Sequence, residues 1–353
     1  MKTIKPFSSG DLKEAIAKLG SNINLRQQMV DFLKSSEKKL NVSGINVREE
    51  ISGPIVDSLY GPDDQIVKTL SSGLVITCKY RSKIARDFLM SEEHSDHVWE
   101  PQTTKLLLEL SEKAKNVIVG GAYFGDQALL LAQSIKKNAG VCHCFEVNSE
   151  SLEMLRYNAE NNSLNNMVIN FKGLWKNDNT YLSIVGEDSH AGTIETNKGI
   201  QAVTIATYCK EKGINKIELI MVDVEGGEFA ILQGAEYFLK KNANEAPNLI
   251  FEVHRSYIDW SHGLENTDII KYLNDLGYTS FAIRDYQGNV NMSGRPIEII
   301  PVSNIYLEGP PHGFNMLAIK DITLVEKHNL KLCSGVSPKL ILHKNPKIFQ
   351  PLN

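Results

Sequence analysis

The sequence predicts an α/β fold in which a mostly parallel sheet is covered by helices on both faces. From Asn116 onward, short apolar runs typical of strands, such as V-I-V at 117–119, alternate with helical patterns. This alternation is typical of parallel strands joined by helices. The first strand also runs directly into a glycine turn, V-G-G-A-Y-F-G at 119–125, and a helix follows. A turn of this kind allows a ligand to approach backbone N–H groups at the start of a helix.

The end of the sheet predicts a third feature, an antiparallel pair. The apolar runs 278–284 and 315–320 are strand-like, and the Gly- and Pro-rich insertion 285–313 between them has no helical pattern. Two strands without a crossover helix between them pair antiparallel.

A helical and hairpin extension is predicted before the sheet. Apolar residues of segment 1–50 recur at helical spacing, with a break at Gly20. The runs I-V-K-T-L and L-V-I-T-C-K-Y, joined by Ser71-Ser72-Gly73, predict a hairpin because glycine readily adopts the positive φ of a tight turn. A helix at 104–114 leads into the sheet.

The remaining elements divide the chain into three parts. Strands are expected at 117–119, 141–147, 167–171, 217–222 and 249–253, and helices at 126–138, 149–162, 204–212, 228–241 and 266–276. The parts are an extension at 1–100, a cofactor-binding domain at 101–321 and an irregular tail at 322–353. The extension is expected either to cover the substrate side or to form an oligomer contact. The sequence leaves a homodimer open.

Composition excludes several classes of protein. The 353 residues include 38 Lys plus Arg and 42 Asp plus Glu, so the formal charge of −4 does not favour nucleic acid as a partner. Five cysteines, an odd number, do not predict a disulfide framework, and a reducing cytoplasm is expected. No apolar run approaches the roughly 18 to 20 residues of a membrane span, and the N-terminus has no signal-peptide core.

The glycine turn and one acid together predict a nucleoside cofactor. Gly120, Ala122 and Gly125 satisfy a loose G-x-G-x-x-G pattern, and Glu146 ends the second strand 21 residues after Gly125. An acid at this place accepts hydrogen bonds from the two hydroxyls of a ribose. The pattern fits a nicotinamide dinucleotide and S-adenosylmethionine equally well.

Three acids lie at the carboxyl end of the fourth strand, in M-V-D-V-E-G-G-E. Asp223 and Glu225 are two residues apart and lie on one side, where ligands bind in open α/β sheets. Two adjacent anions require a cationic partner, a metal or a shifted pKa. Glu228 either contacts substrate or favours the positive end of its own helix dipole.

The segments D-V-E-G-G-E-F-A-I-L-Q-G-A, G-A-Y-F-G with F-E-V-N, and I-F-E-V-H resemble the FkbM family of S-adenosylmethionine-dependent methyltransferases. The resemblance covers about 98–320 and is strongest at 222–235. It implies a seven-stranded Rossmann-like class I methyltransferase sheet with an antiparallel last strand. It also implies methyl transfer to oxygen, commonly a hydroxyl of a sugar or natural product.

The resemblance also implies which residues bind the cofactor. Val119 stands where family members usually have Asp, and Tyr123 where they have Asn. Glu100 in V-W-E-P and Asp126 are therefore the candidates that hold the cofactor ammonium. The full cofactor-binding set is Glu100, Gly121, Ala122, Tyr123, Gly125, Asp126, Glu146, Val147, Gly173, Leu174, Trp175 and Asp223, of which Gly173, Leu174 and Trp175 fall where an adenine ring is commonly sandwiched.

Methyl transfer to an alkyl hydroxyl requires a base or a metal that lowers the hydroxyl pKa. His254, in F-E-V-H-R, is the expected base beside Asp223 and Glu225. A metal alternative uses Asp223, Glu252 and Glu225 as oxygen ligands for Mg²⁺ or Ca²⁺. His94 and His97 have ligand spacing but are expected in a lid or on the surface. Substrate is assigned to Glu228, Arg255, Tyr257 and Trp260, with the hairpin region and the insertion 285–313 around it.

The sequence therefore favours an S-adenosylmethionine-dependent O-methyltransferase that acts on a small sugar-like acceptor. Two alternatives from other classes are a nicotinamide-dependent oxidoreductase and a non-catalytic cofactor-binding protein of the same fold. The three acids after the fourth strand and the lack of a second nucleotide-binding half argue against the oxidoreductase, whereas Val119 and Tyr123 favour the non-catalytic protein.

Overall fold

A computed structural model describes residues 8–40, 44–185, 192–286, 288–308 and 313–352 of the chain. A nine-stranded sheet in the order β16-β14-β12-β15-β11-β10-β3-β4-β5 forms its centre. In chain order these strands are β3 (Asn116–Gly120), β4 (Val141–Phe145), β5 (Met167–Asn170), β10 (Leu219–Val222), β11 (Asn248–His254), β12 (Thr279–Ile283), β14 (Glu298–Pro301), β15 (Gly313–Ile319) and β16 (Lys331–Leu332).

The pairing confirms the predicted α/β class. Strands β3, β4, β5, β10 and β11 are parallel, and β15 is antiparallel to both β11 and β12. The seven expected strands are all present. Two further strands, β14 and β16, extend the β12 edge. Strand β14 comes from the segment read as an insertion, because its four residues are too few to give a clear period.

Two groups of helices cover the sheet. Val117 and Val119 of β3 face the core that contains Leu129, whereas Ile118 faces the core that contains Tyr208. Successive strand residues point to opposite faces, so each face has its own helices. The helices on the two faces of the sheet are α5 (Pro101–Ser111), α6 (Ala128–Lys136), α7 (Ser149–Asn161), α8 (Ile205–Lys212), α9 (Glu228–Gly234), α10 (Glu236–Leu239) and α11 (Asp268–Asp275). The short 3-10 helices are η3 (Leu264–Asn266) and η4 (Val302–Asn304). All five cysteines are buried without disulfides.

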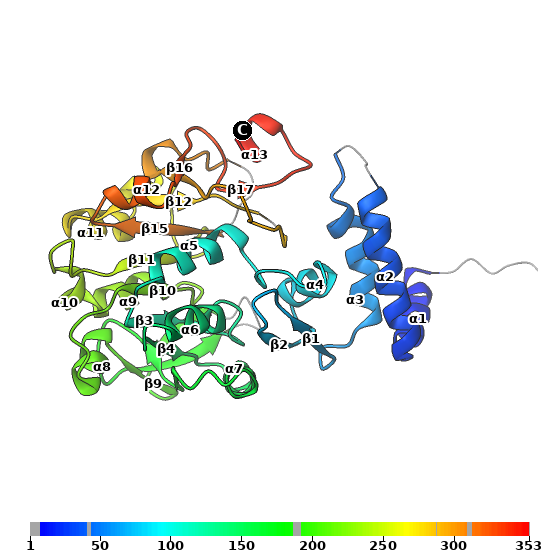
Figure 1. Cartoon of the computed structure of the whole chain (residues 1–353), viewed down its shortest axis with the longest axis horizontal. Helices are drawn as coiled ribbons and strands as arrows, with labels where there is room; N and C mark the ends of the chain where they lie inside the picture. Colours follow the sequence, from blue (N-terminus) through cyan, green and yellow to red (C-terminus); the bar gives the residue numbers. More distant parts are fainter. Residues whose placement is uncertain (1–7, 41–43, 186–191, 287, 309–312, 353) are drawn as a thin grey trace, which may run out of the picture.

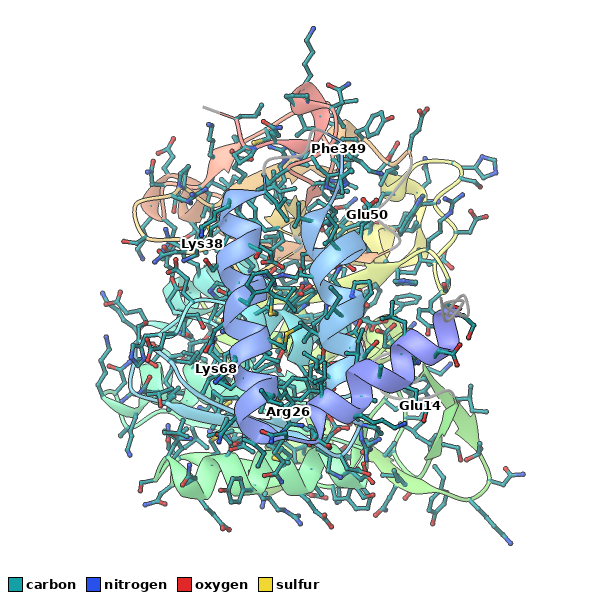
Figure 2. The ribbon with its side chains drawn as sticks, turned by 90° about the vertical axis from the view of Figure 1, so that its right-hand side faces the viewer. Glu14, Arg26, Lys38, Glu50, Lys68 and Phe349 are labelled. Carbon is teal, nitrogen blue, oxygen red and sulfur yellow. The ribbon has the colours of Figure 1, made fainter. Side chains whose placement is uncertain are left out.

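The N-terminal extension forms a separate group of helices beside the sheet. Figure 1 shows α1 (Ser9–Gly20), α2 (Ile23–Lys39) and α3 (Gly53–Leu59) at one end of the molecule, with α4 (Lys83–Met90) between them and the sheet. A π-helical segment, η1 (Arg48–Ser52), precedes α3. Figure 2 views this face and shows α1, marked by Glu14, lying obliquely beside α2. No helix of the described segments is long and apolar enough to cross a bilayer.

The predicted hairpin is confirmed. Strands β1 (Gln65–Thr69) and β2 (Val75–Lys79) pair antiparallel, and Gly73 in the connection has φ +85°. A second small sheet was not predicted. Its order is β6-β9-β7-β8, and its strands are β6 (Gly173–Leu174), β7 (Tyr181–Val185), β8 (Gly192–Thr196) and β9 (Ile200–Val203).

The prediction of an irregular C-terminal tail was wrong. The tail contains α12 (Thr323–Lys327), β16, β17 (Lys339–Leu340) and α13 (Pro346–Phe349), and β17 pairs with β13 (Asp285–Tyr286).

Arg284, 0% exposed, explains why the tail is ordered. Its guanidinium pairs with Glu298 and donates to the carbonyls of Ser337 at 2.9 Å, Ile348 at 2.9 Å and Gln350 at 2.7 Å. A buried charge requires such partners, and backbone carbonyls have no residue signature that could reveal them.

Candidate functional site

A cavity of about 330 Å³ opens at the carboxyl ends of β3 and β10. After β3 the chain adds β4 and β5 on one side and then returns to place β10 on the other. Ligands bind at such a switch point in open α/β sheets. The lining residues are Lys83, Ile84, Trp99, Glu100, Gly120, Gly121, Tyr123, Asp126, Gln127, Phe145, Glu146, Val147, Asn148, Ser151, Lys172, Gly173, Leu174, Trp175, Leu182, Met221, Asp223, Val224, Glu225, Ile231 and Glu252.

The glycine turn lies against the end of β10. Gly121 has φ +78°, and a Cβ there would lie 1.8 Å from the carbonyl oxygen of Asp223. The Asp223 N–H donates to the Gly120 carbonyl at 3.0 Å. Only glycine therefore permits this approach. Ala122 and Gly125, both predicted cofactor residues, shape the turn without lining the cavity.

Glu146 is held by the backbone around it. Its Oε2 accepts the Tyr123 N–H at 2.7 Å, and its Oε1 accepts the N–H groups of Val147 at 2.8 Å and Asn148 at 2.7 Å. Burial raises the pKa of this carboxyl, and the three N–H donors act in the opposite direction. A carboxylate offers about four acceptor sites, so one remains for a ligand hydroxyl.

The predicted adenine-binding residues come together on one wall. Gly173, Leu174 and Trp175 line the cavity with Val147, and β6 carries the first two. The Trp175 indole N–H donates to Glu195 at 3.2 Å, which fixes the plane of the ring. These four residues are apolar, as the wall of a base-binding site requires.

Glu100 projects from the start of α5 and is held from three distant parts of the chain. Its Oε2 accepts the side-chain amides of Asn315 at 2.6 Å and Gln127 at 3.2 Å, and Lys339 Nζ lies 3.8 Å from Oε1. Asp285 fixes the start of the same helix by accepting two of its backbone N–H groups. Asp126 also lines the cavity, as Glu100 does.

Asp223, Glu225 and Glu252 form a carboxylate cluster. One oxygen from each lies within 4.8 Å of the other two. Burial, and then the neighbouring carboxylates, raise the pKa of Asp223 and of Glu252 well above their usual range, and raise that of Glu225 to about 7. Oε2 of Glu252 is buried and has no hydrogen-bond partner among the described residues. At least one of three such carboxyls stays protonated until a cation binds beside them.

These raised pKa values predict that the ligand-free protein loses stability as pH rises. Burial raises the pKa of Asp126 to about 7, and Glu225 has the same value. A carboxyl whose pKa is higher in the folded than in the unfolded protein holds its proton more tightly when folded. Its contribution to stability is therefore complete below its unfolded pKa of roughly 4 and is lost as the pH rises past 7. Between pH 5 and 7.5 we expect each of the two carboxyls to lower the free energy of unfolding by roughly 2 kcal/mol, measured by urea denaturation.

A double variant, Asp126→Asn with Glu225→Gln, is the control for this pH dependence. It keeps the shapes of both side chains and removes both titrations, so its stability should change less between the two pH values. An unchanged slope in the variant would show that these two groups do not titrate near neutrality.

Neither Glu228 nor His254 lines the cavity. Glu228 is 4% exposed and accepts the N–H groups of Val224 and Gly226, so it holds the acidic turn and does not line the cavity. His254 also lies outside the lining, and its Nδ1 accepts the Ser256 N–H at 3.1 Å. This bond occupies the lone pair of Nδ1 in the neutral ring.

The other predicted residues lie around the site. Arg255, Tyr257 and Trp260 line a separate hollow of about 420 Å³ that follows β11. Tyr257 packs against Gly226, where a Cβ would lie 2.7 Å from its ring, so this loop borders the acidic turn. His97 pairs with Asp96 and His94 with the Thr69 carbonyl, and neither lines the cavity. Residues 287 and 309–312 of the insertion lie outside the described residues.

Backbone strain marks the same cavity. Glu100, Tyr123 and Glu225 have φ values of 48°, 47° and 56°, and all three line it. The left-handed region costs a non-glycine residue about 1 to 2 kcal/mol, so such residues concentrate at functional sites. Sequence reasoning missed several lining residues, including Lys83 and Ile84 from the N-terminal extension and Lys172. No motif marks them, because the fold alone brings them to the cavity.

The strand order, with its antiparallel strand β15, and the acid after β4 define a class I S-adenosylmethionine-dependent methyltransferase fold. Residues 120–280 match the model of the methyltransferase FkbM domain. Just under half of the chain is thus similar to the methyltransferase FkbM domain, and that family implies S-adenosylmethionine as its cofactor. No curated protein matches the chain.

Solved structures that match part of the chain share little sequence with it. The methyltransferase FkbM from Methylobacillus flagellatus KT is 14% identical with a TM-score of 0.34, over 59% of this chain and 44% of that one. The chain therefore spans less than half of that protein. An O-methyltransferase from Bacillus cereus in complex with SAH is 14% identical (TM-score 0.36, 64% and 83% covered). A SAM-dependent methyltransferase from Agrobacterium tumefaciens is 10% identical (TM-score 0.39, 73% and 70% covered).

Proposed function

We propose that the chain is an S-adenosylmethionine-dependent O-methyltransferase that acts on a hydroxyl of a small, sugar-like acceptor. The charge of the cavity carries the proposal. Six carboxylates and two lysines line it, the acids being Glu100, Asp126, Glu146, Asp223, Glu225 and Glu252. Because burial raises the pKa values of these acids, they ionise most readily beside a positive charge, so the cavity favours a cationic cofactor over the pyrophosphate of a nicotinamide dinucleotide.

The residues fit this cofactor from end to end. Glu146 supplies an acceptor for the ribose, and the wall at Trp175 accepts the base. Gln127 Oε1 is buried and has no hydrogen-bond partner among the described residues, and an ammonium supplies three N–H donors for such oxygens. Glu100 and Asp126 balance its charge. S-adenosylmethionine, when bound, supplies an electrophilic methyl group on a sulfonium.

Glu225 is the proposed base. Its pKa of about 7 lies near the operating pH, which is optimal for a group that must accept a proton. Glu225 would accept the proton of the acceptor hydroxyl when its oxygen takes the methyl group, while the bond from that carbon to sulfur breaks and S-adenosylhomocysteine leaves. The hollow at Arg255, Tyr257 and Trp260 is the proposed acceptor side, because Tyr257 packs on the turn that carries Glu225.

Calorimetric titration tests the cofactor, and a methyl-transfer assay with a panel of glycosides tests the chemistry. S-adenosylhomocysteine should bind at micromolar concentration and NADH should not bind. Glu225→Gln should keep this affinity and lower kcat by roughly a hundredfold, as expected for a lost general base. Tight NADH binding would overturn the cofactor assignment. Full turnover by Glu225→Gln would overturn the base assignment.

A divalent cation at the carboxylate cluster is a second candidate for activating the acceptor. The spacing of Asp223, Glu225 and Glu252 favours it, since three carboxylates are a suitable ligand set for Mg²⁺ or Ca²⁺. Such an ion would lower the pKa of the acceptor hydroxyl. Loss of turnover in EDTA, restored by Mg²⁺, would select this mechanism, whereas unchanged turnover would select Glu225 alone.

A further inference from the structure

Helix α7 contacts the free edge of strand β2 through two asparagines. Asn158 Oδ1 accepts the Thr77 N–H at 2.9 Å, and its Nδ2 donates to the Thr77 carbonyl at 2.8 Å. Asn162 makes the same pair of bonds with Val75, both at 2.7 Å. These side chains therefore bond the edge of the hairpin as a neighbouring strand would.

The geometry explains why this contact fits. Residues i and i+4 of a helix lie on one face about 6 Å apart along the axis. Residues i and i+2 of a strand point their N–H and C=O groups to one edge about 6.6 Å apart. Asn158 and Asn162 thus match Thr77 and Val75 in spacing, and α7 covers a strand edge that would otherwise be unpaired.

Asn158 differs from Asn162 in one further bond. Its Nδ2 also donates to the Phe124 carbonyl at 2.9 Å, within the glycine turn, and its side chain is 0% exposed. The preceding residue, Tyr123, donates its N–H to Glu146. The turn is thus held by Glu146 on the cavity side and by Asn158 on the hairpin side.

We propose that Asn158 is a positioning residue that couples the N-terminal hairpin to the cofactor-binding turn. It does not line the cavity, and neither do β1 and β2. A bound cofactor orders the glycine turn and so fixes the position of the Phe124 carbonyl. This carbonyl in turn holds the side-chain amide of Asn158, which bonds the edge of β2 at Thr77. By reciprocity, a docked hairpin increases the affinity for cofactor by the same factor. This inference rests on the proposed cofactor.

Hydrogen exchange and calorimetry on the full chain test the coupling. In the wild type, S-adenosylhomocysteine should slow amide exchange in 65–79, although no residue of that segment lines the cavity. Asn158→Ala should abolish this protection, speed exchange in 121–125 without ligand, and raise the dissociation constant about tenfold, the effect of about one hydrogen bond. Asn162→Ala is the matched control: hairpin exchange is faster, but ligand still slows it and affinity changes by less than about twofold.

A third variant keeps the test decisive if Asn158→Ala does not fold. The Thr77 N–H points to α7 and takes no part in the hairpin ladder, so Thr77→Pro removes one Asn158 bond at an edge where proline is tolerated. It should weaken the ligand-induced protection of 65–79 while the bond to Phe124 remains. Equal behaviour of the Asn158 and Asn162 variants, or undiminished protection in Thr77→Pro, would overturn the coupling. Failure of the wild type to bind S-adenosylhomocysteine would refute the proposed cofactor, and the ligand-free exchange of 121–125 would still test the positioning role.

Discussion

Replacing Glu146 by alanine is expected to raise the dissociation constant for S-adenosylhomocysteine by at least about a hundredfold, or roughly 2.7 kcal/mol. The variant loses the acceptor for the ribose, and charge-assisted hydrogen bonds of this kind contribute about 1.5 to 3 kcal/mol each. It also leaves the N–H groups of Tyr123, Val147 and Asn148 without their acceptor, so the turn loses its fixed position. Calorimetric titration measures the change.

Two variants serve as controls for this result. Glu153→Ala removes an exposed carboxylate from the neighbouring helix α7 and should leave the affinity unchanged. Glu146→Gln keeps one acceptor oxygen and should bind with intermediate affinity. If Glu146→Ala binds within about threefold of the wild type, this acid does not hold the ribose.

Gly121→Ala should destabilise the fold by at least about 3 kcal/mol, a size reached only by a few mechanisms. The new Cβ would meet the Asp223 carbonyl oxygen at 1.8 Å, and φ is +78°, which is unfavourable for alanine. The strand ends of β3 and β10 would have to separate, and with them the two halves of the cavity. Urea denaturation at fixed pH reports the loss.

Gly213→Ala is the matched control, because it shares the positive φ and lacks the clash. Gly213 ends α8 with φ +69°, and nothing lies within 4 Å of an added Cβ. It should lose only about 1 kcal/mol, the cost of the left-handed conformation. Equal losses in the two variants would mean that backbone conformation, and not close approach to Asp223, explains the need for glycine at position 121.

Much of the sheet could be predicted from sequence because its strands are buried and its turns have definite chemistry. Apolar runs predicted β3, β4, β10 and β11. The lack of a helical pattern before 315–320 predicted that β15 is antiparallel. Glu146 and Asp223, which both line the cavity, were predicted because each ends a strand where a parallel sheet binds ligands. These predictions rest on local pattern, which one sequence contains in full.

Features that depend on distant contacts could not be predicted. Glu100 is fixed by Asn315 and Lys339, more than 200 residues further on, and no spacing rule relates them. Alternation along β11 correctly placed Glu252 at the cavity, but it could not show that Ser256 engages His254. The small sheet formed by β6, β7, β8 and β9 was not predicted, because its strands are short and partly polar. Position relative to a ligand, unlike strand identity, is a tertiary property.

The C-terminal tail determines when the site can form during synthesis. Glu100 and Arg284 leave the ribosome before the segment that supplies Lys339 and the carbonyls of Ser337, Ile348 and Gln350. Until that segment emerges, the guanidinium has no carbonyl partners and cannot be buried, and Glu100 lacks its cation. The strands of the central sheet can pair earlier, since they are translated earlier. A nascent chain should therefore acquire its fold before it acquires its affinity for cofactor.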